Sequence, residues 1–430
     1  MERRSFLGGL AAATTPPSTS LFPAALAEDR KNGPLKIAAV EIWQVTGHHE
    51  VQTGIDRQYQ AQAIHIYDEL RPKPYADAKK SEKVSVPTSA LYLKIRTDTG
   101  LEGLYGPIDK ETAIVIDEQL SRFLIGKDPL AGEKLWDQMY RSYRHARHGL
   151  FMMAISAVDN TLWDLRGRYY QAPVYRLLGG PTRDPVEAYA SCLGYSLEPE
   201  AVVKRSTQFK KEGFRYQKWF LAYGPGSGAE GMAKNVELVR ILRETLGDDT
   251  ELMFDSFMGW DLNYALDWAK RVERYRPHWM EESFATEKID SFAQLRRSTS
   301  VPVATGEHVY GRWEAYEYMR AGAVNVLQTD PEWTGGVSEL TKICAVASLF
   351  DVQVIPHGHA LHAALHVVAS QSPMTCPLVE YLVLKMSSWH EFEKYPPVLN
   401  GAKIALSDRP GFGIELDPAK IEKQTQMHWS

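Results

Sequence analysis

The sequence contains few cysteines and no excess of basic charge. Three of its 430 residues are cysteines, and none lies in a Cys-x-x-Cys or Cys/His metal-binding spacing. This argues against a disulfide framework and against a zinc finger, so we expect Cys192, Cys344 and Cys376 to be structural. The formal net charge of −5 offers no positive field to a phosphate backbone, which argues against nucleic-acid binding.

Long hydrophobic runs and nucleotide-binding glycine motifs are also missing. No segment reaches the ~20 apolar residues needed to span a bilayer, so we expect no membrane span. No strand-like segment is followed by Gly-x-Gly-x-x-Gly, so nothing supports a dinucleotide site. With 44% hydrophobic and 24% charged residues, the composition is that of a globular protein large enough for a barrel and one further domain.

The amino-terminal residues 1–28 have the pattern of an export signal. Arg3 and Arg4 precede a run of small, weakly apolar residues that ends in an Ala-x-Ala cleavage pattern at Ala25 and Ala27. This resembles a twin-arginine signal, which carries folded proteins. We therefore expect export to the periplasm, and a cytoplasmic protein if the signal is not used.

Residues 36–168 predict an α+β domain. The alternation of apolar residues at 37–46 and 91–95 predicts antiparallel strands, and the periodicity at 112–125 and 150–168 predicts helices.

Residues 47–88 show no clean period, and we expect a long loop that acts as a lid. His48 lies in this segment, and we expect it to contact the substrate.

Residues 186–384 predict a parallel (β/α) barrel. Short apolar segments alternate there with stretches of helical periodicity. The segments are residues 186–190, 216–220, 252–255, 279–281, 301–305, 324–328, 352–356 and 378–381. Residues 385–430 are interrupted by proline and glycine, and we expect them to fold back onto the first domain.

Ionisable residues lie at or near the ends of seven of these strands. They are Lys218, Asp255, Glu281, Glu307, Asp330, His357 and Glu380. The carboxyl ends of barrel strands meet at one mouth, where catalytic groups are expected. Like charges crowded there repel one another unless a cation or a reaction requires them, so this series predicts an active site.

Asp255, Glu281 and Glu307 end three consecutive strands and can converge on one cation. Carboxylate oxygens are ligands for a hard divalent ion, so we expect Mg²⁺. Zinc is disfavoured because the cluster offers no cysteine and only one well-placed histidine.

His357 and Asp330 end neighbouring strands and predict a general base with a carboxylate that orients it. We expect Lys218 to face the metal from the other side, where it neutralises a carboxylate or acts as an acid. Glu380, on the eighth strand, is expected to contact the substrate.

Together these residues resemble the mandelate racemase subgroup of the enolase superfamily. The resemblance covers about residues 36–418 and includes Trp-Met-Glu-Glu ending at Glu282, Thr-Gly-Glu ending at Glu307, and Ile-Pro-His-Gly around His357. It implies a modified TIM barrel capped by an α+β domain that the amino-terminal region and the carboxyl-terminal tail form together. It also implies that the three carboxylates hold Mg²⁺ while the His–Asp pair removes the proton α to a carboxylate.

One departure narrows the expected reaction. Racemases of this subgroup have a second basic lysine two residues beyond the position that Lys218 matches, and Phe220 stands there. The sequence is most similar to acid-sugar dehydratases of the L-rhamnonate dehydratase type, which implies a hydro-lyase that eliminates water from an acid sugar. A racemase or epimerase acting on a hydroxy acid, with Lys218 as second base, and a non-catalytic sugar-acid binding protein remain as alternatives. We also expect a homo-oligomer.

Overall fold

The computed structural model describes residues 34–53, 60–71, 82–145 and 147–429. The expected export signal at residues 1–28 lies outside the described residues. Among the described helices, none is both long and apolar enough to cross a membrane.

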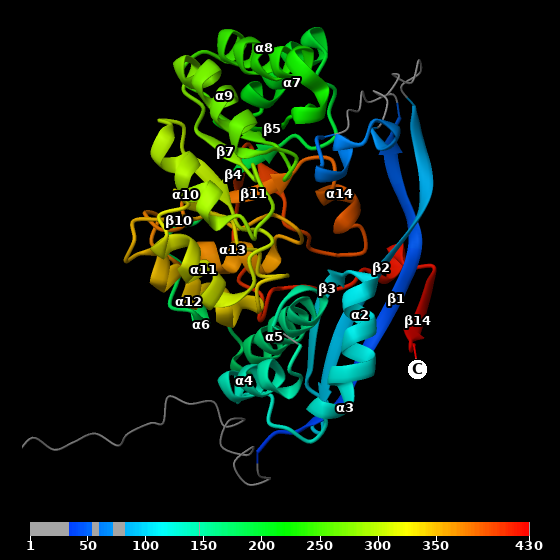
Figure 1. The fold of residues 1–430 in the computed structure, drawn as a ribbon. Coiled ribbons are helices and arrows are strands. Elements are labelled where there is room, and N and C mark those ends of the chain that lie inside the picture. Colours follow the sequence, from blue (N-terminus) through cyan, green and yellow to red (C-terminus); the bar gives the residue numbers. More distant parts are fainter. Residues whose placement is uncertain (1–33, 54–59, 72–81, 146, 430) are drawn as a thin grey trace, which may run out of the picture.

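An antiparallel sheet in the order β14-β1-β2-β3 forms one side of the molecule (Figure 1). Its strands are β1 (Ile37–Gln52), β2 (Lys83–Thr97), β3 (Glu102–Ile108) and β14 (Lys423–Met427). Leu93 and Ile95 of β2 are fully buried in the core beneath the sheet. The pairing of Ile42 with Met427 brings the carboxyl-terminal end of the chain onto this sheet, as expected for a cap built from both ends.

The first two strands are longer than the sequence predicted. Gln52 pairs with Lys83, so residues 47–52 and 83–88 form a ribbon of two strands and the expectation of a loop there is wrong. His48 consequently lies in β1. Residues 60–71 contain two short 3₁₀ turns, Ala63–Ile66 and Asp68–Leu70.

Helices cover the sheet and connect it to the second part of the chain. They are α2 (Lys110–Val115), a π-helical turn (Ile116–Leu120), α3 (Ser121–Leu124), α4 (Gly132–Ser142), α5 (Gly149–Tyr170) and α6 (Val174–Leu177). Figure 1 shows α5 between the sheet and the barrel helices, and it packs against both β3 and α12. Most of α5 is buried because both of its sides are covered, so it has no polar face of the usual kind.

Eight parallel strands form the barrel. They are β4 (Val186–Ser191), β5 (Tyr216–Phe220), β6 (Glu251–Asp255), β7 (Trp279–Glu281), β8 (Val303–Thr305), β9 (Val326–Leu327), β10 (Gln353–Val354) and β11 (Val379–Leu382). Each pairs with the next from β4 to β10, and β11 pairs with β4. Within the described ranges no ladder joins β10 to β11. That seam is held by a hydrogen bond of 2.7 Å from the Val354 amide to the Thr375 carbonyl.

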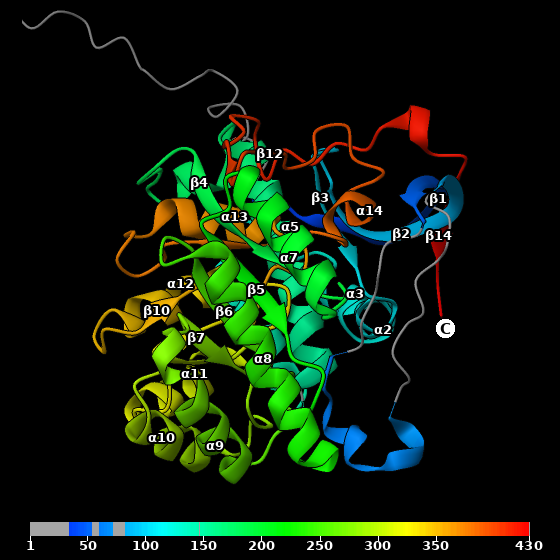
Figure 2. The same ribbon diagram turned by 90° about the horizontal axis from the view of Figure 1, so that it is seen from above.

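Helices lie outside these strands, as Figure 2 shows for α8 to α10. They are α7 (Pro199–Lys211), α8 (Gly228–Leu246), α9 (Leu262–Val272), α10 (Ile289–Ser298), α11 (Gly311–Arg320), α12 (Gly336–Ala347) and α13 (His362–Ser370). The short helix α14 (Met386–Trp389) lies between the barrel and the cap (Figure 1). The short strands β12 (Leu399–Asn400) and β13 (Lys403–Ile404) add an antiparallel pair to β4. The apolar segments recognised in the sequence therefore correspond to the strands of the barrel.

The amino end of α12 is docked onto α5. The Ser338 amide donates to Asp159 Oδ2 at 2.9 Å, and the Val337 amide donates to Asn160 Oδ1 at 3.0 Å. These are the amides that a helix's first turn leaves without partners of its own. Gly336 has a φ of +81°, and a Cβ atom there would lie 2.4 Å from Asp159 Oδ2. Glycine is required at this position because both the backbone conformation and the close approach exclude a side chain.

Candidate active site

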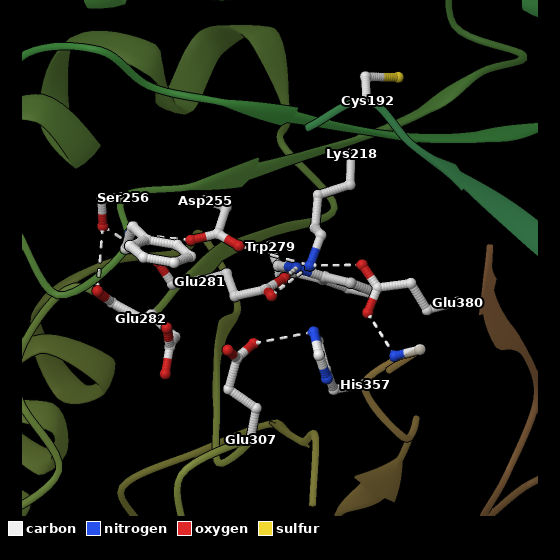
Figure 3. Close-up of polar contacts among 12 residues, drawn as sticks. Cys192, Lys218, Asp255, Ser256, Trp279, Glu281, Glu282, Glu307, His357 and Glu380 are labelled. Atoms are coloured by element: carbon white, nitrogen blue, oxygen red, sulfur yellow. Dashed lines mark hydrogen bonds and ion pairs between the residues drawn. The ribbon is translucent and has the colours of Figure 1, made fainter. Parts of the chain in front are cut away.

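Lys218 lies at the centre of a buried group of carboxylates (Figure 3). Its Nζ atom is 2.5 Å from Glu281 Oε1, 2.9 Å from Glu380 Oε1 and 3.4 Å from Asp255 Oδ2. All four side chains are 1% exposed or less. The parallel register places Asp255 directly beside Glu281, so two of the predicted metal ligands come from neighbouring strand ends.

Lys218 and Glu380 shift each other's pKa values toward their ionised forms. Burial lowers the pKa of Lys218, but the carboxylates of Glu281 and Glu380 outweigh burial and raise it well above its usual value. Burial raises the pKa of Glu380, but Lys218 and His357 lower it to about 2. The ammonium and the Glu380 carboxylate therefore both remain ionised, as a buried pair needs in order to offset its desolvation.

His357 and Asp330 form the expected pair. His357 Nδ1 lies 2.7 Å from Asp330 Oδ2, and Asp330 is itself held by the backbone amides of Glu332 at 2.6 Å and His359 at 3.3 Å. Because Asp330 accepts the proton on Nδ1, the Nε2 atom is left as the basic nitrogen. The Trp333 ring packs against the imidazole, with 4.8 Å between ring centroids, and so fixes its plane.

The free nitrogen of His357 faces the metal side of the mouth. Nε2 lies 3.9 Å from Glu307 Oε2. Burial lowers the pKa of His357, but Glu307, the hydrogen bond to Asp330, and Glu380 outweigh burial and raise it to about 9. A cation that neutralises Glu307 removes the largest of these raising effects and brings the imidazole closer to the neutral form that a base requires.

The residues around Glu307 fit a divalent cation. Oxygen atoms of Glu282 and Glu307 and a ring nitrogen of His308 lie within 4.8 Å of one another. Both carboxylate oxygens of Glu282 are buried without a hydrogen-bond partner in the described chain. Burial raises the pKa of Asp255 and of Glu282 well above the usual value, and neighbouring carboxylates add to both shifts. A divalent cation would stabilise the ionised form of these carboxyl groups, and carboxylate oxygens are ligands that Mg²⁺ prefers.

The predicted metal ligands divide between two neighbouring groups. Asp255 and Glu281 point toward Lys218, whereas Glu307 points toward His357 (Figure 3). The charge of Glu307 acts on Asp255, which places all three around the same side of the mouth.

Of the two residues expected to contact substrate, one lies in this cluster. Glu380 contacts Lys218 and accepts a hydrogen bond of 2.9 Å from the Gly358 amide. His48 instead pairs with Glu422 of the tail, 2.6 Å away, on an exposed face of β1. Successive residues of a strand point to opposite faces, and it is His49 that lines a cavity of about 550 Å³ near the mouth.

That cavity extends from the mouth toward the long ribbon of the cap. Ser191, at the end of β4, and Lys385, after β11, line it together with His49. The Ser191 hydroxyl lies beside Glu380 and helps to lower its pKa. The cavity therefore begins where the buried charge cluster ends.

Some residues of the site carried no interpretable sequence signal. Trp279 donates a 2.7 Å hydrogen bond from Nε1 to Glu281, and Trp333 packs on the base, but both resemble ordinary core aromatics in sequence. Glu282 and His308 could be found from the sequence, because each directly follows a predicted metal ligand at a strand end.

The sequence matches two family descriptions. Residues 67–179 match the mandelate racemase / muconate lactonizing enzyme N-terminal domain, and residues 201–420 match the enolase C-terminal domain-like family.

Dehydratases are among the relatives of this sequence. The chain is 31% identical over 399 residues to L-rhamnonate dehydratase of Saccharopolyspora erythraea, covering 89% of this chain and 97% of the relative. It is 31% identical to arabinonate dehydratase of Saccharolobus solfataricus, covering 78% and 91% of the two chains. The structure of rhamnonate dehydratase from Gibberella zeae complexed with Mg is similar with a TM-score of 0.76 and 27% identity, covering 91% and 96%.

Proposed function

The chain belongs to the mandelate racemase / muconate lactonizing enzyme family of the enolase superfamily, and from this membership and the site we propose an Mg²⁺-dependent acid-sugar dehydratase. It removes the proton α to the carboxylate and eliminates the β-hydroxyl as water. The product is a 2-keto-3-deoxy acid. The observation that carries the proposal is the buried His357–Asp330 pair at the mouth, whose free nitrogen faces the acidic cluster.

In this reaction His357 takes the α-proton on Nε2. Asp330 keeps the ring oriented through the 2.7 Å contact to Nδ1 and stabilises the imidazolium that forms. The same imidazolium can return a proton to the leaving hydroxyl, so one residue serves both halves of the elimination. Trp333 covers the ring and limits the access of water to it.

We propose that Asp255, Glu281 and Glu307 hold the Mg²⁺, supported by their position at three adjacent strand ends. When bound, Mg²⁺ supplies positive charge to the substrate's carboxylate oxygens, where negative charge develops as the α-proton leaves. Glu282 is buried beside these residues and adds negative charge to the site.

Lys218 acts as a fixed positive charge in this proposal. Its three carboxylate partners surround the ammonium within 3.4 Å. The ring of Phe220 lies 5.2 Å from the Lys218 nitrogen, in the place where racemases of the family carry a second lysine. Dehydration from one face needs only one base, which this arrangement provides.

The deciding experiment follows two reactions at once. The Mg²⁺-loaded protein is incubated with L-rhamnonate, with arabinonate and with further acid sugars in D₂O, and ¹H NMR records both keto-acid formation and loss of the α-proton signal. We expect dehydration of at least one acid sugar. Exchange without dehydration would instead identify a racemase or epimerase, and the absence of both with every acid sugar would favour a binding protein.

We further propose that the chain is exported to the periplasm in folded form through residues 1–28, supported by Arg3, Arg4 and the Ala-x-Ala pattern ending at Ala27. A cytoplasmic location is the alternative if the signal is not used. Cell fractionation with amino-terminal sequencing of the mature protein distinguishes the two.

We also propose a homo-oligomer. Leu349 is 79% exposed beside the contact between Tyr316 and Phe350, which gives the α11–α12 surface an apolar patch. Apolar patches on a surface mark contact sites. Light scattering on the purified protein tests this, and the mass of a single chain would refute it.

A further inference from the structure

A second cluster of possible metal ligands lies outside the active site. His362 begins α13, His390 follows α14, and Glu393 lies three residues farther along. His362 Nε2 is 2.8 Å from Glu393 Oε2, and His390 Nδ1 is 2.7 Å from Glu393 Oε1. The exposed fractions are 3% for both histidines and 0% for Glu393. One carboxylate therefore bridges two imidazoles in the interior.

Glu393 is a buried anion without a fixed cation. Each of its two carboxylate oxygens faces one imidazole nitrogen. Within the described part of the chain no lysine or arginine forms an ion pair with this carboxylate. Lys420 approaches only the backbone carbonyl of Glu393, at 3.4 Å. A buried carboxylate needs a positive partner, and a proton or a metal ion between the ligands can supply it.

One further polar group near this place lacks a partner. The hydroxyl of Tyr92, from β2 of the cap, is buried without a hydrogen-bond partner in the described chain, and Glu393 is near enough for its charge to act on that hydroxyl. The Nε2 atom of His390 is also buried and without a partner, but it lies on the other side of the ring from the nitrogen that contacts Glu393. Leu361, just before His362, has a φ of +67°, which is rare and strained for a branched residue. The chain thus holds His362 in place at a cost in backbone conformation.

The donor set selects one class of metal. The ligand atoms of His362, His390 and Glu393 lie within 4.8 Å of one another. Two imidazole nitrogens and one carboxylate oxygen suit zinc and similar divalent transition metals, whereas Mg²⁺ prefers oxygen alone. We propose that these three residues bind one divalent transition-metal ion, zinc above all, at a site separate from the Mg²⁺ site. The ion would replace the protons between the rings and the carboxylate.

The position of this site gives it a structural role. It joins the start of α13 to the segment after α14. Trp389, next to His390, packs edge-on against His359 with 4.9 Å between centroids, and His359 donates its amide to Asp330. The metal site therefore fastens the segment that lies behind the catalytic base.

Metal content tests the proposal directly. Protein purified from a zinc-supplemented culture is dialysed against excess Mg²⁺, and zinc is measured by mass spectrometry. We expect about one zinc per chain, and less than about a tenth of that in His390→Gln and in Glu393→Gln, because loss of one of three ligands opens the site. His366→Gln is the matched control. His366 is another buried histidine on α13, but it accepts a 3.1 Å hydrogen bond from the Tyr175 amide and lies outside the cluster.

A second measurement covers the case in which the variants fail to fold. Cobalt is added to the metal-free wild type in the presence of Mg²⁺, and visible absorption is recorded. A four-coordinate site with nitrogen ligands gives intense d–d bands at one equivalent, while an oxygen-only octahedral site gives weak ones. Wild-type protein without intense bands and without retained zinc would overturn the proposal. So would folded His390→Gln that retains a full equivalent of zinc.

Discussion

Replacing His357 with Asn removes the proposed base while keeping much of its shape. The Asn amide can still hydrogen bond to Asp330, which lies 2.7 Å from the imidazole in the wild type. It cannot reach the place of Nε2, on the far side of the ring. Asp330 cannot replace the base either, because it lies behind the ring, is buried and already accepts two backbone amides.

The expected loss follows from what a positioned base contributes. General bases accelerate proton transfer by about 10²- to 10⁴-fold, or about 3 to 5 kcal/mol of barrier. Since no other group of the described mouth takes over, we expect kcat/KM to fall by about 10³-fold or more. Dehydration and α-proton exchange should fall together because both start with the same transfer. Asp330→Asn keeps the base but holds its ring less firmly, so kcat/KM should fall less, by about 10- to 100-fold.

The assay measures three quantities on each variant. They are the dehydration rate, the loss of the α-proton signal in D₂O, and Mg²⁺ affinity by calorimetry, which should survive in His357→Asn. His278→Asn is the matched control, because His278 also pairs with an acid, Glu251, at 3.2 Å, but at the opposite end of the barrel. If His357→Asn exchanged the α-proton at nearly the parent rate while Lys218→Ala did not, the base would be the lysine and the reasoning would fail.

Three further predictions concern the metal, the buried charge and the signal. Glu307→Gln should weaken Mg²⁺ binding by calorimetry, and unchanged affinity would remove Glu307 from the ligand set. Lys218→Met leaves three buried carboxylates without their cation, so we expect a loss of about 3 to 5 kcal/mol of unfolding free energy in EDTA, partly restored by Mg²⁺. Urea unfolding measures this, and equal stability in EDTA would contradict it. Arg3→Lys with Arg4→Lys should retain the precursor inside the cell, and undiminished export in fractionation experiments would argue against a twin-arginine signal.

The barrel was predictable because its strands are short apolar segments, and an ionisable residue lies at or near the end of seven of the eight predicted segments. Burial on every side makes the strands visible as short hydrophobic runs, as in β6, where four of the five residues are buried and the last is Asp255. The same rule identified His357 and Asp330, because parallel strands bring their carboxyl ends to one place.

The ribbon between residues 47 and 88 was not predictable by this reasoning. Exposed residues alternate there with residues of intermediate burial, but Val51, Val84 and Val86 are too few apolar residues to mark the period of two clearly. Neither did the sequence indicate which face His48 would occupy, since that depends on the register with β2. The pairing of Glu393 with two histidines depends on where α14 and the tail return, which local patterns do not encode.

The docking of α12 onto α5 limits how this protein can be recombined with its relatives. The first amides of α12 are buried and find their acceptors on Asp159 and Asn160, so a barrel transplanted without α5 would leave them unpaired, at about 1 to 3 kcal/mol each. A chimera whose crossover lies after α5 takes α5 and α12 from different parents. It keeps this joint only if its α5 carries acceptors that match the first amides of α12. A crossover for engineering should therefore lie before Gly149, inside the cap, so that α5 and α12 come from one parent. The boundary between the two sheets lies later in the chain, before β4.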